Sequence, residues 1–356
     1  MSRADVTMIE CTGIGMSGPQ QGDLTVLPVT EAQRAPMVPG RSSREHAPSV
    51  RAIMKRTGCR RTDLPQRTST KEHDRDHSPA GRTHHRVARV EPRHIARDGA
   101  GLHALWRPGI GMPLVFVPGV MTDAKGWRRV VASVEGPEPT LILNRRGRVP
   151  SGPLGNDYGI ETEVLDLLAW LDWLDEPARL FGWSYGGLVA IETATRSAAV
   201  RHVIAYEPVL RPFGAAAVPA LHAAVAVDDL DRAVEVVNLE VSKYSPEHVA
   251  ALRASPAWES LRLWAAPVAQ ELAALNAFTP DTGRWAALEV PVDLVVGEHS
   301  RDADPYGTAF TAVERLLPGA AVHVLPGQGH LAHIDAPEVL GNLVSNIVAG
   351  RATALD

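Results

Sequence analysis

The chain has 356 residues, 45% of them hydrophobic and 22% charged, which is ordinary for a globular enzyme of one large or two small domains. No run of 18 apolar residues occurs, which excludes a transmembrane helix. The formal net charge of −5 conceals a division of the chain, because residues 1–97 carry a balance of +7 and the remaining 259 residues carry −12.

The first 88 residues differ in kind from the rest. They are rich in Arg, Pro, Ser, Thr and His, whereas all 18 aromatic residues lie at or after Trp106. Such a segment buries too little apolar surface to offset the entropy of ordering it, so we expect a disordered basic tail. Its interspersed acidic residues and lack of stacking groups argue against a nucleic-acid partner. Both cysteines, Cys11 and Cys59, lie here, and the cysteine-free remainder leads us to expect a cytoplasmic protein.

From residue 90 onward, short apolar runs alternate with helical periodicity, as βα units require. Two strand-like segments, 93–96 and 102–106, flank Asp98-Gly99 and indicate a hairpin. Buried strands are predicted at 113–117, 140–143, 179–182, 202–206, 292–296 and 322–325. The stretch 160–174 repeats apolar residues at helical spacing and predicts a helix. The alternation predicts a mostly parallel sheet with helices on both faces.

Between residues 208 and 288 the strand pattern stops and the sequence becomes Ala-rich with helical spacing. Helices are predicted at 228–240 and 246–253, and one or two more at 258–275 around Pro267. An insertion of this length is too long for a plain connection, so we expect a helical cap over the site. The predicted organisation is a tail at 1–88, core segments at 89–208 and 289–356, and the cap at 209–288.

The strongest chemical signal is Gly182-Trp183-Ser184-Tyr185-Gly186, a Gly-x-Ser-x-Gly motif between a predicted strand and a predicted helix. In that context it predicts a nucleophile elbow, a tight turn that holds the serine strained with its hydroxyl presented to substrate. Ser184 is therefore the candidate nucleophile, and the alternative is a packing turn.

A serine hydroxyl needs a base to take its proton, and that base is most often a histidine oriented by a carboxylate. His330 is the candidate, because it follows the last predicted strand in the loop 326–330 and precedes a helix. His333 is the nearest competitor and could equally be a supporting or surface histidine.

At this point the chain resembles the α/β-hydrolase superfamily, in particular bacterial serine hydrolases with a helical cap, over about residues 90–350. The resemblance rests on the elbow at Ser184, the Pro118-Gly119-Val120 loop after the third strand, the Gly-Gln-Gly-His stretch ending at His330, and the order serine, acid, histidine. It implies an eight-stranded sheet. A serine at the elbow argues against the dehalogenase and epoxide hydrolase chemistry of relatives that carry Asp there.

The acid departs from the commonest pattern of the superfamily. Relatives usually carry Asp after the strand at 292–296, where this chain has Ser300. Some relatives, notably a haloalkane dehalogenase branch, instead carry Glu directly after the strand that follows the elbow helix. Glu207 occupies that place and is the first choice, and the remaining candidates are Asp302, Asp304 and Glu298. The alternative for Glu207 is a contact at the lid hinge.

An oxyanion formed during acyl transfer needs two backbone donors, and the resemblance assigns them to the amides of Val120 and Tyr185. Met121, Trp127 and Trp183 are candidate pocket residues, and the alternative for Trp127 is helix packing. Three arginines, Arg145, Arg146 and Arg148, follow the strand at 140–143 and could bind an anionic substrate, or simply be solvated on a surface loop.

These residues predict a hydrolase of small apolar carboxylic esters, thioesters or lactones, acting through an acyl-enzyme on a small-molecule substrate without metal or organic cofactor. Carbon–carbon bond hydrolases, cofactor-free haloperoxidases and perhydrolases share the superfamily's fold and stay open as alternatives. A non-catalytic ligand-binding protein also stays open, because Ser300 replaces the usual Asp. The sequence leaves the oligomeric state undetermined.

Overall fold

The computed structural model describes residues 90–350. The tail expected at residues 1–88 lies outside these described residues. Within them, every strand predicted from the sequence is present, with bounds that differ by no more than a few residues.

The centre of the fold is an eight-stranded sheet in the order β1-β2-β4-β3-β5-β6-β7-β8. β2 runs antiparallel to both its neighbours, and the pairs from β4 to β8 are parallel. At the hairpin between the first two strands, Asp98 and Gly99 have φ of 52° and 70°, the two positive values of a type I′ turn. The strands are β1 (Glu91–Arg97), β2 (Ala100–Arg107), β3 (Leu114–Val117), β4 (Thr140–Asn144), β5 (Ala178–Trp183), β6 (Val200–Tyr206), β7 (Val292–Gly297) and β8 (Ala321–Leu325).

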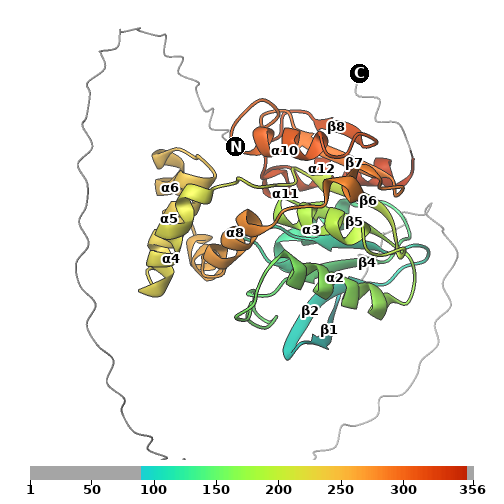
Figure 1. Cartoon of the computed structure of the whole chain (residues 1–356), viewed down its shortest axis with the longest axis horizontal. Coiled ribbons are helices and arrows are strands. Elements are labelled where there is room, and N and C mark those ends of the chain that lie inside the picture. The colour runs from blue at the N-terminus through green and yellow to red at the C-terminus, as the bar shows by residue number, and fades with distance from the viewer. Residues whose placement is uncertain (1–89, 351–356) are drawn as a thin grey trace, which may run out of the picture. The chain divides into compact units, whose positions relative to one another are not determined.

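Helices pack on both faces of the sheet, and each face has its own apolar cluster (Figure 1). α2 (Ile160–Leu174), α3 (Tyr185–Ala194) and α10 (Tyr306–Glu314) contribute to one cluster. The other is formed with η1 (Ala124–Trp127), α1 (Arg128–Ser133), α11 (Ala332–Asp335) and α12 (Pro337–Val348). Because both faces are covered, β3 and β4 are buried along their whole length.

A helical insertion connects β6 to β7, and in Figure 1 its helices α4, α5, α6 and α8 gather beside the sheet. The one or two helices predicted at 258–275 are two, α7 and α8, which separate at Pro267 because proline cannot continue the hydrogen-bond ladder. The helix predicted at 228–240 is α5 followed by a π-helical turn, η3. The elements are η2 (Ala215–Ala217), α4 (Val218–Ala226), α5 (Leu230–Val236), η3 (Val237–Val241), α6 (Pro246–Arg253), α7 (Trp258–Ala265), α8 (Val268–Ala277) and α9 (Thr282–Ala286).

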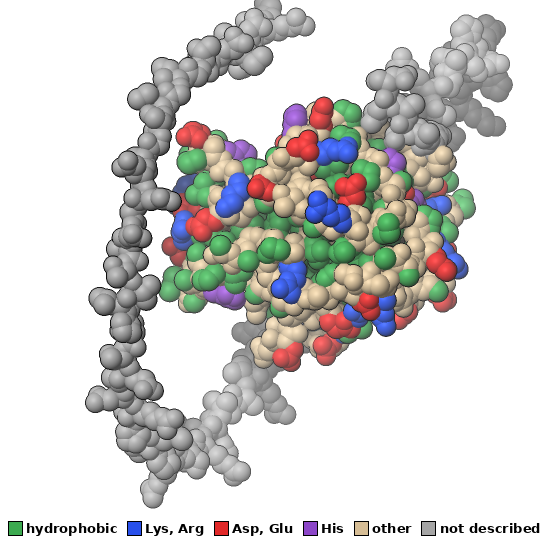
Figure 2. All heavy atoms as spheres, turned by 45° about the horizontal axis from the view of Figure 1, so that its top comes forward, with side chains coloured by type: hydrophobic (Ala, Val, Ile, Leu, Met, Phe, Trp, Pro, Cys, Tyr) green, Lys and Arg blue, Asp and Glu red, His purple; other side chains and the backbone are tan. Residues whose placement is uncertain are grey.

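The face drawn in Figure 2 mixes basic, acidic and hydrophobic side chains, so it presents no large area of one charge. No helix between residues 90 and 350 is both long and apolar enough to cross a membrane.

Candidate active site

Ser184 lies at the sharp turn between β5 and α3 with a φ of 56°, a left-handed conformation that costs a non-glycine residue energy. Gly182 and Gly186, the two glycines of the motif, allow backbone atoms to approach closely on either side of Ser184. A methyl group at Gly186 would lie 2.0 Å from the carbonyl oxygen of Val117, and one at Gly182 would lie 2.5 Å from the carbonyl oxygen of Gly186. The Ser184 N–H donates to the carbonyl of Tyr206 at 2.9 Å, which fixes the turn to β6.

His330 and Glu207 meet at the carboxyl ends of β8 and β6. The imidazole Nδ1 lies 2.7 Å from Glu207 Oε2, and Glu207 Oε1 accepts a hydrogen bond from the Gly297 N–H at 2.8 Å. Glu207 is fully buried and has a φ of 43°. A carboxylate only accepts hydrogen bonds, so Nδ1 carries a proton, and in the neutral imidazole Nε2 is the nitrogen with the lone pair.

The other candidate acids are placed differently. Glu298 is exposed and accepts a hydrogen bond from the Gly327 N–H at 2.7 Å, and Asp304 is exposed and contacts Thr308. Asp302 is also exposed. Ser300, in the position where relatives carry Asp, is buried beside Gly329, where an added methyl group would lie 3.6 Å from its hydroxyl oxygen. Glu207 is the candidate that contacts His330.

Two aromatic rings hold His330 in place. Tyr306 stacks on the imidazole with ring centroids 3.5 Å apart and planes 13° apart, and Trp183 lies at 4.8 Å. Trp183 Nε1 also donates to the carbonyl of His330 at 3.0 Å. The Tyr306 hydroxyl donates to Ser242 Oγ of the helical insertion at 2.9 Å. Sequence reasoning did not single out Tyr306, because a tyrosine that opens a helix carries no motif of its own.

His333 is a buried histidine rather than a surface one. Its ring stacks on Trp127 at 4.7 Å and lies 4.2 Å from Trp183. Among the described residues, its Nδ1 has no hydrogen-bond partner. Burial, and then the neighbouring His330, lower the pKa of His333 from 6.5 to about 3. This ring is therefore neutral at physiological pH.

The loop after β3 lies against the elbow. A methyl group at Gly119 would lie 2.9 Å from the carbonyl oxygen of Trp183 and 3.0 Å from Ser184 Cβ, so only glycine allows this approach. The next residue, Val120, and Tyr185, which begins α3, are the two predicted oxyanion donors. The first-turn amides of a helix have no intrahelical acceptor, so the Tyr185 N–H is available to a ligand. Met121 follows in this loop with a φ of 56°.

Comparison with known proteins now identifies the family. A family model described as the alpha/beta hydrolase family matches residues 114–342. The chain belongs to this family. No curated protein matches this hydrolase.

Solved structures with the same fold cover most of the hydrolase. An α/β hydrolase from Sphaerobacter thermophilus DSM 20745 is 22% identical, with a TM-score of 0.63 over 72% of this chain and 100% of that one. An enol-lactonase from Burkholderia xenovorans LB400 is 20% identical, with a TM-score of 0.61 and the same coverage. A haloalkane dehalogenase loop variant from Bradyrhizobium elkanii is 23% identical, with a TM-score of 0.55 over 73% of this chain and 97% of that one.

The three arginines after β4 are not on a solvated surface, so that expectation was wrong. Arg145, Arg146 and Arg148 of the hydrolase are all buried. Arg145 and Arg148 pair with Glu271 of α8, Arg145 also pairs with Glu163, and Arg146 pairs with Asp166. Buried arginines require such partners, because an unpaired buried charge is costly.

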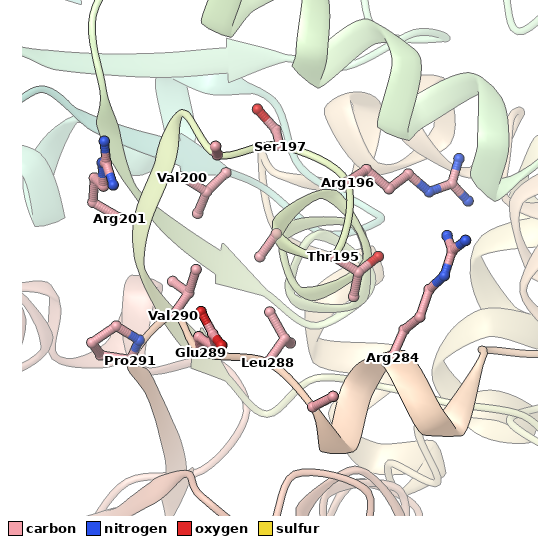
Figure 3. Close-up of a pocket in the computed structure, with 13 residues that line it drawn as sticks. Thr195, Arg196, Ser197, Val200, Arg201, Arg284, Leu288, Glu289, Val290 and Pro291 are labelled. Carbon is pink, nitrogen blue, oxygen red and sulfur yellow. The ribbon is translucent and has the colours of Figure 1, made fainter.

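One groove of the hydrolase lies away from Ser184. It has a volume of about 640 Å³ and is lined by residues 194–201 and 284–291, at the opposite end of α3 (Figure 3). In Figure 3, Arg196 and Arg284 lie on the same side of this groove. Ser184 and His330 are only 4% and 7% exposed, so both side chains lie below the protein surface. No cluster of three or more potential metal ligands occurs within residues 90–350.

Proposed function

We propose that this protein is a serine hydrolase that cleaves carboxylic esters through Ser184, His330 and Glu207. The observation that carries the proposal is the buried 2.7 Å contact between Glu207 and His330 Nδ1, together with a serine held on a strained elbow. A carboxylate in that position fixes the imidazole tautomer and stabilises the imidazolium that forms during the reaction. A buried glutamate held by a backbone amide is suited to that role.

The steps follow from this arrangement. Ser184 Oγ attacks the carbonyl carbon of the ester while His330 Nε2 takes its proton. The negative oxygen of the tetrahedral intermediate accepts hydrogen bonds from the amides of Val120 and Tyr185. The imidazolium then protonates the leaving alcohol, and the acyl group stays on Ser184. Water, deprotonated by His330, attacks the acyl-enzyme and releases the acid.

We propose small, fairly apolar substrates, including thioesters and lactones. The start of the helical insertion lies next to the nucleophile, since the Val209 N–H donates to the carbonyl of Ser184 at 3.4 Å. Val209, Leu210 and Phe213 are all buried in the apolar cluster there. The nearby arginines are neutralised by glutamates, so they do not favour an anionic substrate. The enol-lactonase among the similar structures supports including lactones.

The test is hydrolysis of p-nitrophenyl acetate, butyrate and octanoate by the unmodified protein and by Ser184→Ala, Glu207→Gln and Asp302→Asn. We expect Ser184→Ala to lose about 10³-fold or more in kcat and Glu207→Gln to lose about 10²-fold or more. Asp302→Asn serves as the control, because Asp302 is exposed, and should stay within about twofold.

The alternatives give different results. A non-catalytic binding protein would leave Ser184 unlabelled by a fluorophosphonate probe and all three esters intact. A carbon–carbon bond hydrolase would be labelled at Ser184 but leave the esters intact. A perhydrolase would hydrolyse esters and also form peracid from acetate and peroxide.

A further inference from the structure

Arg145 is a buried guanidinium whose donors converge on the loop beside the nucleophile. Its Nε donates to the carbonyl of Pro118 at 2.7 Å, and its Nη2 donates to the carbonyl of Gly119 at 2.9 Å. Its other side-chain hydrogen bonds are with Glu163 Oε1 and Glu271 Oε1, both at 2.7 Å. Its side chain is only 2% exposed.

These two carbonyls belong to the loop that carries a predicted oxyanion donor. In a planar trans peptide, the C=O and the following N–H point in opposite directions. A guanidinium that holds the Gly119 carbonyl therefore turns the Val120 N–H away from itself. Since a methyl group added at Gly119 would lie 3.0 Å from Ser184 Cβ, this peptide lies next to the nucleophile.

We propose that Arg145 is the positioning residue of the oxyanion hole, orienting the Val120 amide and polarising its peptide toward the developing negative charge. The inference rests on the proposed serine hydrolase function. Arg145 is buried and binds protein groups, so we assign it no contact with substrate. It acts through the backbone, and a charge-assisted hydrogen bond to a carbonyl makes the amide of the same peptide a stronger donor.

The second oxyanion donor is tied to the same guanidinium. Arg145 lies over the ring of Tyr185, 4.7 Å from its centroid. The Tyr185 hydroxyl lies 3.0 Å from that of Tyr158, which in turn donates to Glu163 at 2.6 Å. Both residues that supply the predicted donors are therefore held by one connected cluster.

The cluster keeps Arg145 charged and fixed. Burial would lower the pKa of Arg145, but Glu163 and Glu271 hold it well above its usual value. Burial likewise opposes ionisation of Glu271, but Arg148 and Arg145 keep the pKa of this carboxyl below its ordinary value. Glu271 belongs to α8, so the orientation of the loop at Pro118 and Gly119 also depends on how the helical insertion packs against the rest of the protein.

Arg146 provides a matched control in the same loop. It is buried to a similar degree, but its guanidinium binds Asp166 and the carbonyl of Arg97. We compare Arg145→Gln/Glu163→Gln with Arg146→Gln/Asp166→Asn. Each removes one buried positive and one buried negative charge, so the net charge is unchanged, and each also breaks one further ion pair, Arg145–Glu271 or Arg97–Asp166. Arg145→Lys, which keeps the charge but not the planar fork, serves if the first pair folds poorly.

For each variant, kcat and KM are measured with p-nitrophenyl butyrate, and inhibition with a boronic acid that forms a tetrahedral adduct on serine. We expect the Arg145 pair to lose about 10- to 100-fold in kcat, with a matching loss in boronic acid affinity and KM within about threefold. Arg145→Lys should lie in between, and the Arg146 pair should keep kcat within about threefold at comparable cost in stability.

The inference is overturned if a folded Arg145 variant keeps both kcat and boronic acid affinity within threefold, or if KM rises while kcat is retained. In those cases the unmodified protein still turns over ester, and the proposed function stands. If the unmodified protein neither hydrolyses esters nor reacts with a fluorophosphonate, the proposed function fails and this inference fails with it.

Discussion

At the scale of single residues, the site depends on backbone groups that approach too closely for any side chain between them. Gly119 is the sharpest case, since an added methyl group would lie within 3.0 Å of Trp183 and Ser184. The clash is with the Trp183 ring, with the Trp183 carbonyl oxygen and with Ser184 Cβ, and the last two atoms cannot rotate out of the way. Adding a single carbon atom at Gly119 should therefore displace the loop that carries the predicted oxyanion donor.

We expect Gly119→Ala to lower kcat for p-nitrophenyl esters by about 10- to 100-fold, because it displaces the Val120 amide. The loss in unfolding free energy should be about 1–3 kcal/mol, as for other overpacked sites. Gly101→Ala is the control, because a methyl group there meets only His103, at 3.7 Å. A fully active Gly119→Ala variant would contradict the placement of this loop.

His333 predicts a pH dependence of stability. Its pKa is about 3 in the folded protein and 6.5 when unperturbed, so the unfolded state binds more protons between these values. Stability contributed by the neutral ring is therefore present above about pH 6.5 and lost as the pH falls toward 3, by about 1.4 kcal/mol per pH unit.

We expect His333→Phe to remove this dependence, since Phe keeps the ring contacts with Trp127 and Trp183 without a titrating group. Urea unfolding at pH 7.0 and 4.5 measures it. The unmodified protein should lose about 2–3 kcal/mol more than the variant between these pH values. Equal losses in both proteins would refute the buried neutral state.

At the scale of elements, the candidate acid stands after β6, whereas most relatives carry it after β7. Ser300, after β7, is buried beside Gly329, so a carboxylate there would also lie near the loop of His330. We therefore expect that a carboxylate at the end of either β6 or β7 could bind the same imidazole. In this chain Ser300 stands at the second of these positions.

We expect Glu207→Gln/Ser300→Asp to be at least about tenfold more active toward p-nitrophenyl butyrate than Glu207→Gln alone, because the new carboxylate can stabilise the imidazolium. Ser300→Asp by itself should lower stability, since it brings a second buried negative charge near Glu207. Glu207→Gln/Ser300→Asn matches the size of the substituted side chain without its charge. No rescue over that control would show that β7 cannot supply the acid.

Local sequence patterns predicted the helices and strands well, but they did not predict which buried side chains contact each other. The helix predicted at 160–174 has the same bounds as α2, and the strands follow from apolar runs that both-sided burial requires. The contact between Glu207 and His330 spans 123 residues, and it was anticipated through family resemblance rather than through pattern. Arg145 was misplaced at the surface because its partners Glu163 and Glu271 lie 18 and 126 residues away. A run of charged residues can be predicted to be buried only when the side chains that neutralise it are known.

At the scale of the whole molecule, every residue assigned to the site lies between Pro118 and His333. The family match covers residues 114–342. None of the residues to which we assign a part in the reaction lies in the first 88 residues.

We expect deletion of residues 1–88 to leave kcat/KM for p-nitrophenyl butyrate within about twofold, as for changes remote from a site. The unfolding midpoint should shift by less than about 3 °C. A loss of activity without a loss of stability would assign the tail a part in the reaction and reopen the question of its partner.

The burial of Ser184 has a kinetic consequence. Because Ser184 is only 4% exposed, we expect the helical insertion beside it to move before substrate reaches the hydroxyl. If about 1% of molecules are open at any moment, the apparent affinity for every substrate falls by the same factor of about 100. That factor cancels from the ratio of the apparent affinities for two substrates. The opening equilibrium therefore changes the rate at low concentration of every substrate alike. The choice among them is left to the residues around the serine.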